Sequence, residues 1–318
     1  MDLSFAVGEP QPQPVLQVTA QPVRLPFRIG ARALGSIQRR LIRCASPLEA
    51  GEELPILPAL PANADGYLIT SLRKSHLSGL LADHSGLRPF IRMHYQRHYA
   101  CLSGGFDSYL ARFSAKTRST LKRKMRKLAD RSGGTLDVRS YARADQIEDF
   151  YTHARAVSRT TYQERLLGSG LPEGEEAVTE MRRLAECDAF RGWLLFLDGQ
   201  PISYLYAPAE GDILIYAFLG YDPAHAELSP GTVLQLEAMR QLMAADRFRL
   251  FDFTEGDGQH KRQFATGSVD CVDLLLLRPT PANLLAGHLL NAFDAGVARA
   301  KRIVPALGLT RLARAVRR

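Results

Sequence analysis

The feature that most constrains this chain is a strand–turn–helix signal that begins at Asp212. An apolar run from Ile213 to Leu219 ends at Gly220, and a polar loop then leads to a helical pattern that starts at Ser229–Thr232. Serine is favoured at a helix N-cap, and Pro230 suits the first helical position. The stretch therefore predicts a strand that feeds directly into a helix N-terminus.

The start of this helix is predicted to bind an anion. The N–H groups of the first helical turn lack intrahelical acceptors, and the helix dipole favours negative charge at this end. The alternative is an ordinary turn, since many α/β proteins contain a strand–Gly–helix connection. If the site is real, the residues closest to the anion are Leu219, Gly220, Ser229, Gly231, Thr232 and Val233.

A second predicted strand, Phe248–Phe253, leads into the polar cluster Thr254–Arg262. This cluster places acidic, basic and imidazole side chains at a strand end. Lys261 and Arg262 are candidates to bind phosphate or the charge of a second substrate. The simplest functional interpretation is a phosphate-bearing cofactor beside groups that transfer protons.

The composition is that of a globular protein without metal or disulfide signals. At 318 residues and 46% hydrophobic, the chain can bury a large core in one to three domains. The four cysteines are far apart and have no CxxC spacing, so we expect buried free thiols in a reducing compartment and no metal site. They are Cys44, Cys101, Cys187 and Cys271.

The two ends of the chain carry no export or membrane-spanning signal. Residues 1–14 lack the basic and apolar regions of a signal peptide and are predicted to be a disordered lead-in. The apolar run Pro281–Phe293 is too short to cross a bilayer. We therefore expect a cytoplasmic protein that, if it meets the inner membrane, does so peripherally.

The net charge of +8 is concentrated in two segments. Residues 112–131 carry nine Lys or Arg and one acid, and residues 299–318 carry seven and no acid. Both suggest polyanionic partners, whether nucleic acid, anionic lipid or cofactor phosphates, although either could be a solvated face. Segment 281–318 is predicted to be a basic amphipathic tail on an anionic membrane. The alternative is that its first half covers the core.

The predicted elements alternate between strands and helices. From Leu136 to Leu277 the patterns give β-α-α-β-β-β-α-β-α-β, preceded by a helix over residues 107–131 with its basic residues on one face. A helix that crosses over after the fourth strand, together with hairpin turns, predicts an α/β fold with a mixed sheet.

This element order resembles the GNAT acyltransferase fold, and the local sequences resemble the CelD/BcsL-type branch related to FemAB proteins. The likeness is carried by Leu102–Leu128, Ala217–Leu234 and Phe251–Gly267. It implies tandem GNAT-like lobes with mixed twisted sheets flanked by helices. The implied division is a lead-in at 1–14, a degenerate lobe at 15–134 with the basic helix 107–131, a catalytic lobe at 135–280 and the tail at 281–318.

The resemblance implies an N-acyltransferase that uses acyl-CoA and an amine. An alkyl ammonium with a pKa near 10 is charged at neutral pH and must lose a proton before it attacks, so a general base is needed. Glu255 and His260 are the candidates. Glu255 could instead cap a helix or pair with a neighbouring cation, and His260 could be a packed surface histidine.

Two further roles follow from the same resemblance. Backbone N–H groups near Phe218–Gly220 would stabilise the oxyanion where the fourth strand splays from the fifth. Tyr221 would protonate the departing thiolate, or else serve as a packed interface aromatic.

The sequence constrains the type of reaction more than it constrains the identity of the acyl donor or of the acceptor. Where most GNAT proteins have a Gly-rich loop, this chain has Glu227–Thr232 with one glycine, and related FemAB proteins use aminoacyl-tRNA. The favoured acceptor is a sphingoid-type long-chain amine, which would give a ceramide. The alternatives are amino sugars of an exopolysaccharide, a tRNA-dependent ligase or nucleic-acid binder, and a non-catalytic scaffold. Nucleic acid is disfavoured because the basic residues of 112–131 are not interleaved with stacking aromatics.

Overall fold

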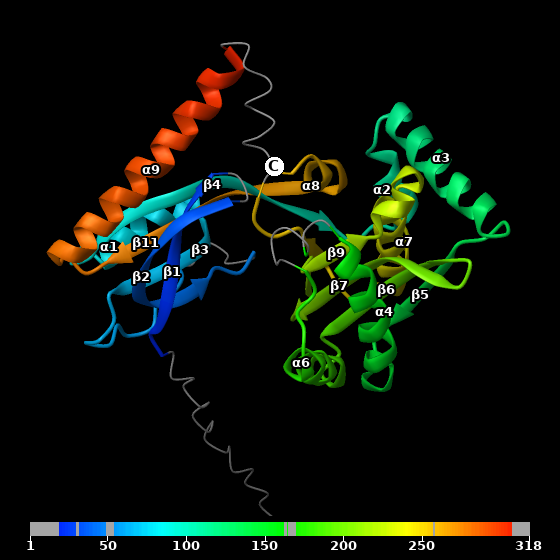
Figure 1. Cartoon of the computed structure of the whole chain (residues 1–318), viewed down its shortest axis with the longest axis horizontal. Coiled ribbons are helices and arrows are strands. Elements are labelled where there is room, and N and C mark those ends of the chain that lie inside the picture. The colour runs from blue at the N-terminus through cyan, green and yellow to red at the C-terminus, as the bar shows by residue number, and fades with distance from the viewer. Residues whose placement is uncertain are drawn as a thin grey trace, which may run out of the picture. The chain divides into compact units, whose positions relative to one another are not determined.

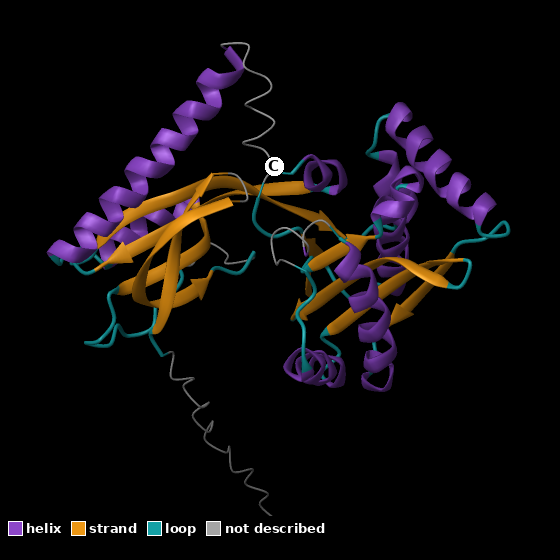
Figure 2. Ribbon diagram, viewed as in Figure 1, coloured by secondary structure: helices purple, strands orange, loops and turns teal. Residues whose placement is uncertain are grey.

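The computed structural model describes residues 19–29, 32–48, 54–161, 164, 170–256 and 258–306. It divides the chain into two compact units (Figures 1 and 2). Unit 1 comprises Met1–Met93 and Val272–Arg318, and unit 2 comprises His94–Cys271. Unit 2 is therefore one continuous stretch, whereas unit 1 is assembled from two separate stretches of the chain.

Unit 1 contains a mixed sheet in the order β1-β2-β3-β11-β4. β1 and β2 form an antiparallel hairpin, and β2 runs parallel to β3. Its helices and strands are β1 (Gln21–Ile29), β2 (Arg32–Ala45), β3 (Gly66–Arg73), the 3₁₀ helix η1 (Lys74–His76), α1 (Leu77–Asp83), α9 (Pro281–Ala306), and the unit 1 residues of β4 (Arg88–Cys101) and β11 (Gly267–Leu277).

The long helix α9 packs on this sheet through its N-terminal half. Asn283, Ala286 and Leu290 are buried, and the ring of Phe293 lies 5.2 Å from that of Phe27. This is the covering role that the sequence left as an alternative for the tail. Gly287 makes the approach close, because a Cβ at this position would lie 2.5 Å from Cε1 of the buried Phe90.

We predict that Gly287→Ala destabilises the protein by roughly 1–3 kcal/mol, because the added methyl group overpacks a buried ring. Gly296→Ala on the same helix is the matched control. A Cβ there meets nothing within 4 Å, so the better helix propensity of alanine should stabilise by up to about 1 kcal/mol. Urea unfolding of both variants measures the difference. Equal stability of the two would contradict the packing of α9.

Unit 2 contains the sheet order β11-β4-β10-β8-β7-β6-β5, with β9 also paired to β7. The elements that lie wholly within it are α2 (Phe106–Ala111), α3 (Ala115–Arg131), β5 (Asp137–Tyr141), η2 (Ala144–Gln146), α4 (Ile147–Thr160), α6 (Glu175–Glu186), β6 (Phe190–Leu197), β7 (Gln200–Glu210), β8 (Ile213–Ile215), β9 (Phe218–Tyr221), η3 (Pro223–Leu228), α7 (Pro230–Ala245), β10 (Leu250–Asp252) and α8 (Gln259–Phe264).

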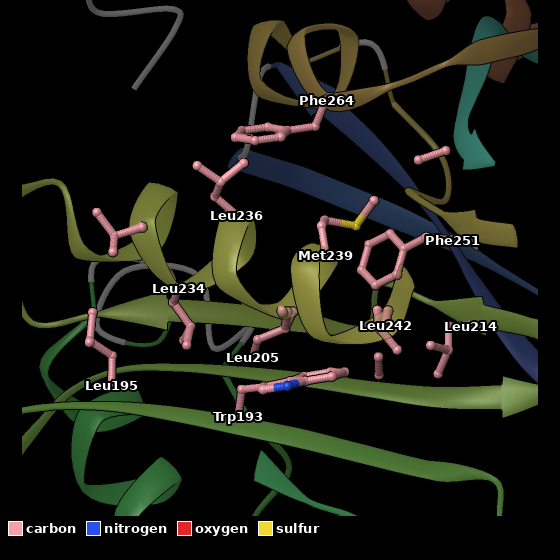
Figure 3. Close-up of a cluster of buried hydrophobic side chains, with 14 of the residues drawn as sticks. Trp193, Leu195, Leu205, Leu214, Leu234, Leu236, Met239, Leu242, Phe251 and Phe264 are labelled. Atoms are coloured by element: carbon pink, nitrogen blue, oxygen red, sulfur yellow. The ribbon is translucent and has the colours of Figure 1, made fainter. Parts of the chain in front are cut away.

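Alternation along β6 and β7 divides the side chains between two cores. Leu194 and Tyr204 point to the face covered by α4 and α6, whereas Leu195 and Leu205 point to the face covered by α7. α7 is buried nearly all round, since it also contacts α2 and α3. Figure 3 shows the second core, with Trp193 and Leu205 of the sheet beside Leu234 and Leu242 of α7.

The structure corrects the predicted elements in three places. β1 and β2 are strands that the sequence analysis did not assign. The single helix expected over 107–131 is two helices, because Ser114 caps α3 by accepting a hydrogen bond from the Thr117 N–H at 3.2 Å. The single strand expected to end at Leu219 is broken into β8 and β9.

The expectation of buried thiols holds only for Cys271. Cys187 is exposed, and Cys44 and Cys101 are part-buried. The difference in exposure follows from position: Cys187 follows the end of α6, whereas Cys271 is in the middle of β11.

Other expectations for the ends of the chain stay predictions. The lead-in at 1–14 and the last part of the tail, 307–318, lie outside the described residues. The tandem-lobe division at 134/135 was implied by the family resemblance and remains a prediction. It differs from the two units, which meet at residues 93/94 and 271/272. Among the helices that the structure describes, none is long and apolar enough to cross a bilayer.

Candidate active site

The site is built around a break in one strand of unit 2. Tyr216 N–H donates to the Asp252 carbonyl on β10 at 2.8 Å, and Ala217 N–H donates to the Tyr206 carbonyl on β7 at 3.3 Å. β10 ends at Asp252, so beyond this point the strand continues as β9 and pairs with β7 alone. The sheet is thereby opened on one side of β9.

A β-bulge accompanies this opening. Leu214 lies opposite Ala209, and Phe218 lies opposite Tyr206, so four steps along this strand span three steps along β7. Bulges of this kind bend a strand and are common beside active sites.

The register of β9 determines which backbone groups face the opening. Asp222 N–H donates to the Ile202 carbonyl at 2.9 Å in the same register as the β9–β7 pairs. In an antiparallel ladder, alternate residues bond to the partner strand. Gly220 therefore bonds toward β7, and the N–H groups of Leu219 and Tyr221 face the open side.

A cavity of about 370 Å³ lies at this opening, within the size range of small-molecule sites. It brings together β9, the start of α7 and α8. Its lining contains six residues predicted from the sequence, together with Tyr216 and Ala226, which were not. The lining residues are Tyr216, Leu219, Tyr221, Ala226, Ser229, Gly231, Thr232 and His260.

The N-terminus of α7 differs from the predicted anion site in its hydrogen bonds. Ser229 has left-handed backbone angles, with φ 55°, and its side chain makes no capping hydrogen bond. Its carbonyl accepts from Thr232 N–H at 3.0 Å and from Val233 N–H at 3.2 Å. Of the N–H groups of Gly231, Thr232 and Val233, which begin the helix, only that of Gly231 has no acceptor among the described residues.

Close packing explains the glycines at the cavity and excludes Val233 from it. A Cβ on Gly231 would lie 2.9 Å from Cδ2 of Leu219, and a Cβ on Gly220 would lie 2.9 Å from Cγ2 of Thr161. Val233 is 1% exposed and packs in the core of α7. Gly220 and Val233 therefore support the site without lining it.

His260 projects from α8 into an aromatic environment. Its ring centroid lies 5.2 Å from that of Phe264 and 5.9 Å from that of Tyr216, and its Nε2 lies 3.4 Å from the Tyr216 hydroxyl. Burial, with a smaller effect from the Lys261 charge, lowers the pKa of His260 to about 4. The imidazole is therefore neutral at pH 7, with a lone pair on one ring nitrogen, and is a weaker base than an exposed histidine.

The lowered pKa of His260 predicts a pH dependence of stability. In the unfolded chain this histidine has a pKa near 6.5, so between about pH 6.5 and 4 the unfolded state binds a proton that the folded state does not. The free energy of unfolding therefore falls as the pH drops from about 6.5 to 4. His260→Gln cannot titrate and should lose this component. Urea unfolding of both proteins at several pH values tests it. If the free energy of unfolding of the wild type rose relative to that of the variant as the pH falls, the lowered pKa of His260 would be contradicted.

Two tyrosines line the cavity in different environments. Tyr221 is 40% exposed and lies beside Gly231 at the start of α7, and its role as a proton donor stays a prediction. Tyr216 is part-buried, and burial raises its pKa. Tyr216 was not predicted to belong to a site, because an aromatic residue inside an apolar run has the signature of a core residue.

Glu255 does not occupy the position that the sequence suggested. Its side chain is exposed and does not line the cavity, so it is not a buried carboxylate among apolar neighbours. Within the described part of the chain its carboxylate forms no ion pair with the neighbouring cations, and α8 has no side-chain capping hydrogen bond. The Lys261 ammonium instead donates to the main-chain carbonyl of Glu255 and, at 3.4 Å, to the Thr254 hydroxyl.

The two predicted cations of α8 also lie outside the cavity lining. Lys261 is part-buried, and desolvation lowers its pKa, whereas Arg262 is exposed. The turn before them is held by the buried Asp252, which accepts from Thr254 N–H at 2.8 Å and pairs with Arg97. Thr254 has φ 61°, a strained value for a β-branched residue.

Residues 115–262 match the family profile described as acetyltransferase (GNAT) domain. None of the curated proteins matches the sequence.

Two solved structures have a similar fold. One is the C-terminal domain of a protein described as a lysylphosphatidylglycerol synthetase from Agrobacterium fabrum, with a TM-score of 0.51 and 15% identity over 73% of this chain and 72% of that chain. The other is FemX, with a TM-score of 0.51 and 10% identity over 71% of this chain and 75% of that chain. The protein has a GNAT-like fold with a large mixed sheet flanked by helices.

Proposed function

We propose that the protein is an N-acyltransferase that moves an acyl group from acyl-CoA to an amine of a cell-envelope precursor. The observation that carries the proposal is that a neutral imidazole, an open strand edge and the start of α7 all face one cavity. The first can accept a proton, the second can donate to an oxyanion, and the third favours a phosphate.

The chain's own groups account for each step of such a transfer. His260 takes a proton from the ammonium of the acceptor, so that the nitrogen lone pair can attack the thioester carbonyl carbon. The Leu219 N–H donates to the oxygen on which negative charge develops. When the C–S bond breaks, Tyr221 gives its hydroxyl proton to the departing thiolate. The attacking nitrogen loses its second proton, which reprotonates Tyr221 through solvent, and His260 releases the proton that it took up to solvent. The products are an amide and a free thiol.

The proposed acceptor is a long-chain amine of the sphingoid type. Support comes from the segment 281–318, which combines apolar and basic residues. On α9, Leu285 and Leu289 are 62% and 48% exposed, as a helix that lies on an anionic membrane would need. Such an acceptor would reach the enzyme from the inner leaflet, to which the protein would bind peripherally.

The choice between His260 and Glu255 as base gives a direct test. We expect His260→Ala to lower kcat for N-acyl transfer by about 10²- to 10⁴-fold, the usual contribution of a general base. Glu255→Gln should change kcat only a few-fold, because the exposed carboxylate does not line the cavity.

The assay is mass spectrometry of amide products formed from acetyl-CoA or palmitoyl-CoA with a sphingoid base or an amino sugar. Transfer of acetyl groups to the amino sugar would replace the lipid acceptor by an exopolysaccharide precursor. A larger loss in Glu255→Gln than in His260→Ala would overturn the assignment of the base.

A second candidate function is aminoacyl transfer from tRNA, and it is favoured by one observation on α3. This helix carries eight Lys or Arg in 17 residues, and none of them pairs with a carboxylate anywhere in the described chain. The Lys127 ammonium donates to the Glu227 carbonyl at 3.0 Å, two residues before Ser229 of the cavity lining. An RNA backbone along α3 would therefore end near the cavity.

Removing positive charge from α3 tests whether aminoacyl-tRNA is the donor. A Lys122→Gln, Arg123→Gln and Arg126→Gln variant should bind aminoacyl-tRNA more weakly and with a smaller salt dependence, because each lost phosphate contact lowers the salt slope by about 0.7–0.9. The matched control replaces three exposed arginines that are already paired with acids, Arg139, Arg143 and Arg183. Filter binding at several salt concentrations measures both. Equal binding by the two variants, or no binding by the wild type, would reject tRNA as the donor.

A further inference from the structure

The hydroxyl of Tyr216 has one hydrogen-bond partner in the described chain, the imidazole of His260. Its oxygen lies 3.4 Å from Nε2, and catalytic hydrogen bonds are often this long before a substrate binds. Both side chains line the cavity beside β9. The proposed transfer uses the imidazole but gives the hydroxyl no part.

The position of Tyr216 is fixed through its backbone and through its ring. Its N–H donates to the Asp252 carbonyl at the end of β10, at 2.8 Å. Its ring centroid lies 6.0 Å from that of Phe251 and 5.8 Å from that of Phe253. Because both parts of the residue are held, the hydroxyl stays beside the imidazole.

The direction of this hydrogen bond follows from the acidity and basicity of the two groups. A phenol, with an ordinary pKa near 10, is a much stronger acid than the N–H of a neutral imidazole. The unprotonated imidazole nitrogen is in turn a much stronger base than a phenol oxygen. The Tyr216 hydroxyl therefore donates and Nε2 accepts. Burial raises the pKa of Tyr216, so the hydroxyl keeps its proton at neutral pH.

This direction determines which nitrogen of His260 carries the ring proton. A neutral imidazole has one lone pair and one N–H, so a lone pair on Nε2 places the proton on Nδ1. Nδ1 has no partner in the described chain and is not among its fully buried unpaired atoms. An ammonium group that approached the accessible nitrogen would meet an N–H donor. The basic nitrogen is instead reached through the Tyr216 oxygen.

We propose that Tyr216 is a catalytic residue that passes the proton of the acceptor amine to His260. One N–H bond of the ammonium breaks and an O–H bond forms on Tyr216, while the original hydroxyl proton moves to Nε2. The amine nitrogen keeps the electron pair and attacks the thioester carbon, and His260 becomes an imidazolium. After the products leave, the proton returns to solvent by the same path, which restores the starting tautomer. The proposal rests on the proposed function and identifies the group that contacts the amine.

The tautomer of His260 tests the proposal in the free protein. Imidazole ¹⁵N chemical shifts distinguish Nδ1–H from Nε2–H, and the signals of His260 are identified by their loss in His260→Gln. We expect Nδ1–H in the wild type and a shift toward Nε2–H in Tyr216→Phe, which keeps the ring and removes the donor. An Nε2–H tautomer in the wild type would overturn the relay, because Nδ1 could then take the proton directly.

The second readout is kcat for N-acyl transfer, measured by mass spectrometry of the amide product. Tyr216→Phe should lower kcat by about 10²- to 10⁴-fold, as much as His260→Ala, since each variant removes the same proton path. The double variant should be no slower than either single variant, because the effects of groups that act as a unit do not add.

Tyr109→Phe is the matched control. The buried Tyr109 hydroxyl donates to the Phe264 carbonyl at the end of α8, at 2.7 Å. Its removal should lower the melting temperature and leave both the tautomer of His260 and kcat unchanged. If Tyr109→Phe lowered kcat as much as Tyr216→Phe, any change near α8 would disturb the site, and the specific role of Tyr216 would be overturned.

The remaining outcomes separate the relay from the proposed function. If the wild type forms an amide and Tyr216→Phe forms it at the same rate, only the relay fails. If the wild type forms no amide from acetyl-CoA or palmitoyl-CoA with either class of amine, the proposed function fails and the relay fails with it.

Discussion

The arrangement of unit 2 depends on where β10 stops. The hydrogen bond from Tyr216 N–H to the Asp252 carbonyl is the last that this strand makes toward β10, and the next one, from Ala217, goes to β7. Asp252 itself is held by Arg97 and by Thr254 N–H. A buried ion pair thus fixes the end of one strand, and the free edge of β9 and the cavity beside it follow from that end.

Around this opening the protein retains features that do not favour folding. Ser229 and Thr254 have left-handed backbone angles, and the surroundings of the part-buried His260 disfavour its charged form. Each costs stability on its own. Ser229 and His260 line the cavity. Such features are typical of a binding or catalytic site, where the packing of the surrounding core offsets them.

Much of this was accessible from the sequence, because the periodic signals of unit 2 are strong. The start of α7 was predicted at Ser229-Pro230, and Tyr221 and His260 were predicted to approach it. The break at Tyr216 was not, since a bulge depends on pairing with β7 and β10 rather than on local composition. Glu255 could not be ranked against His260 from the sequence, because both follow the same strand and only the fold decides which of them lines the cavity. The alternation in β1, where Val23 and Leu25 flank Arg24, was present but was obscured by prolines.

Unit 1 is completed from both ends of the chain, and this determines when it can fold during synthesis. β3 needs β11 as its neighbour, yet the unit 1 part of β11 begins at Val272. All of unit 2 is translated before that residue leaves the ribosome, and domains generally fold as their chain emerges. The edge of β3 therefore stays open through most of translation. An unpaired edge strand is prone to mispairing, so this half of the protein is the part that would depend most on a chaperone.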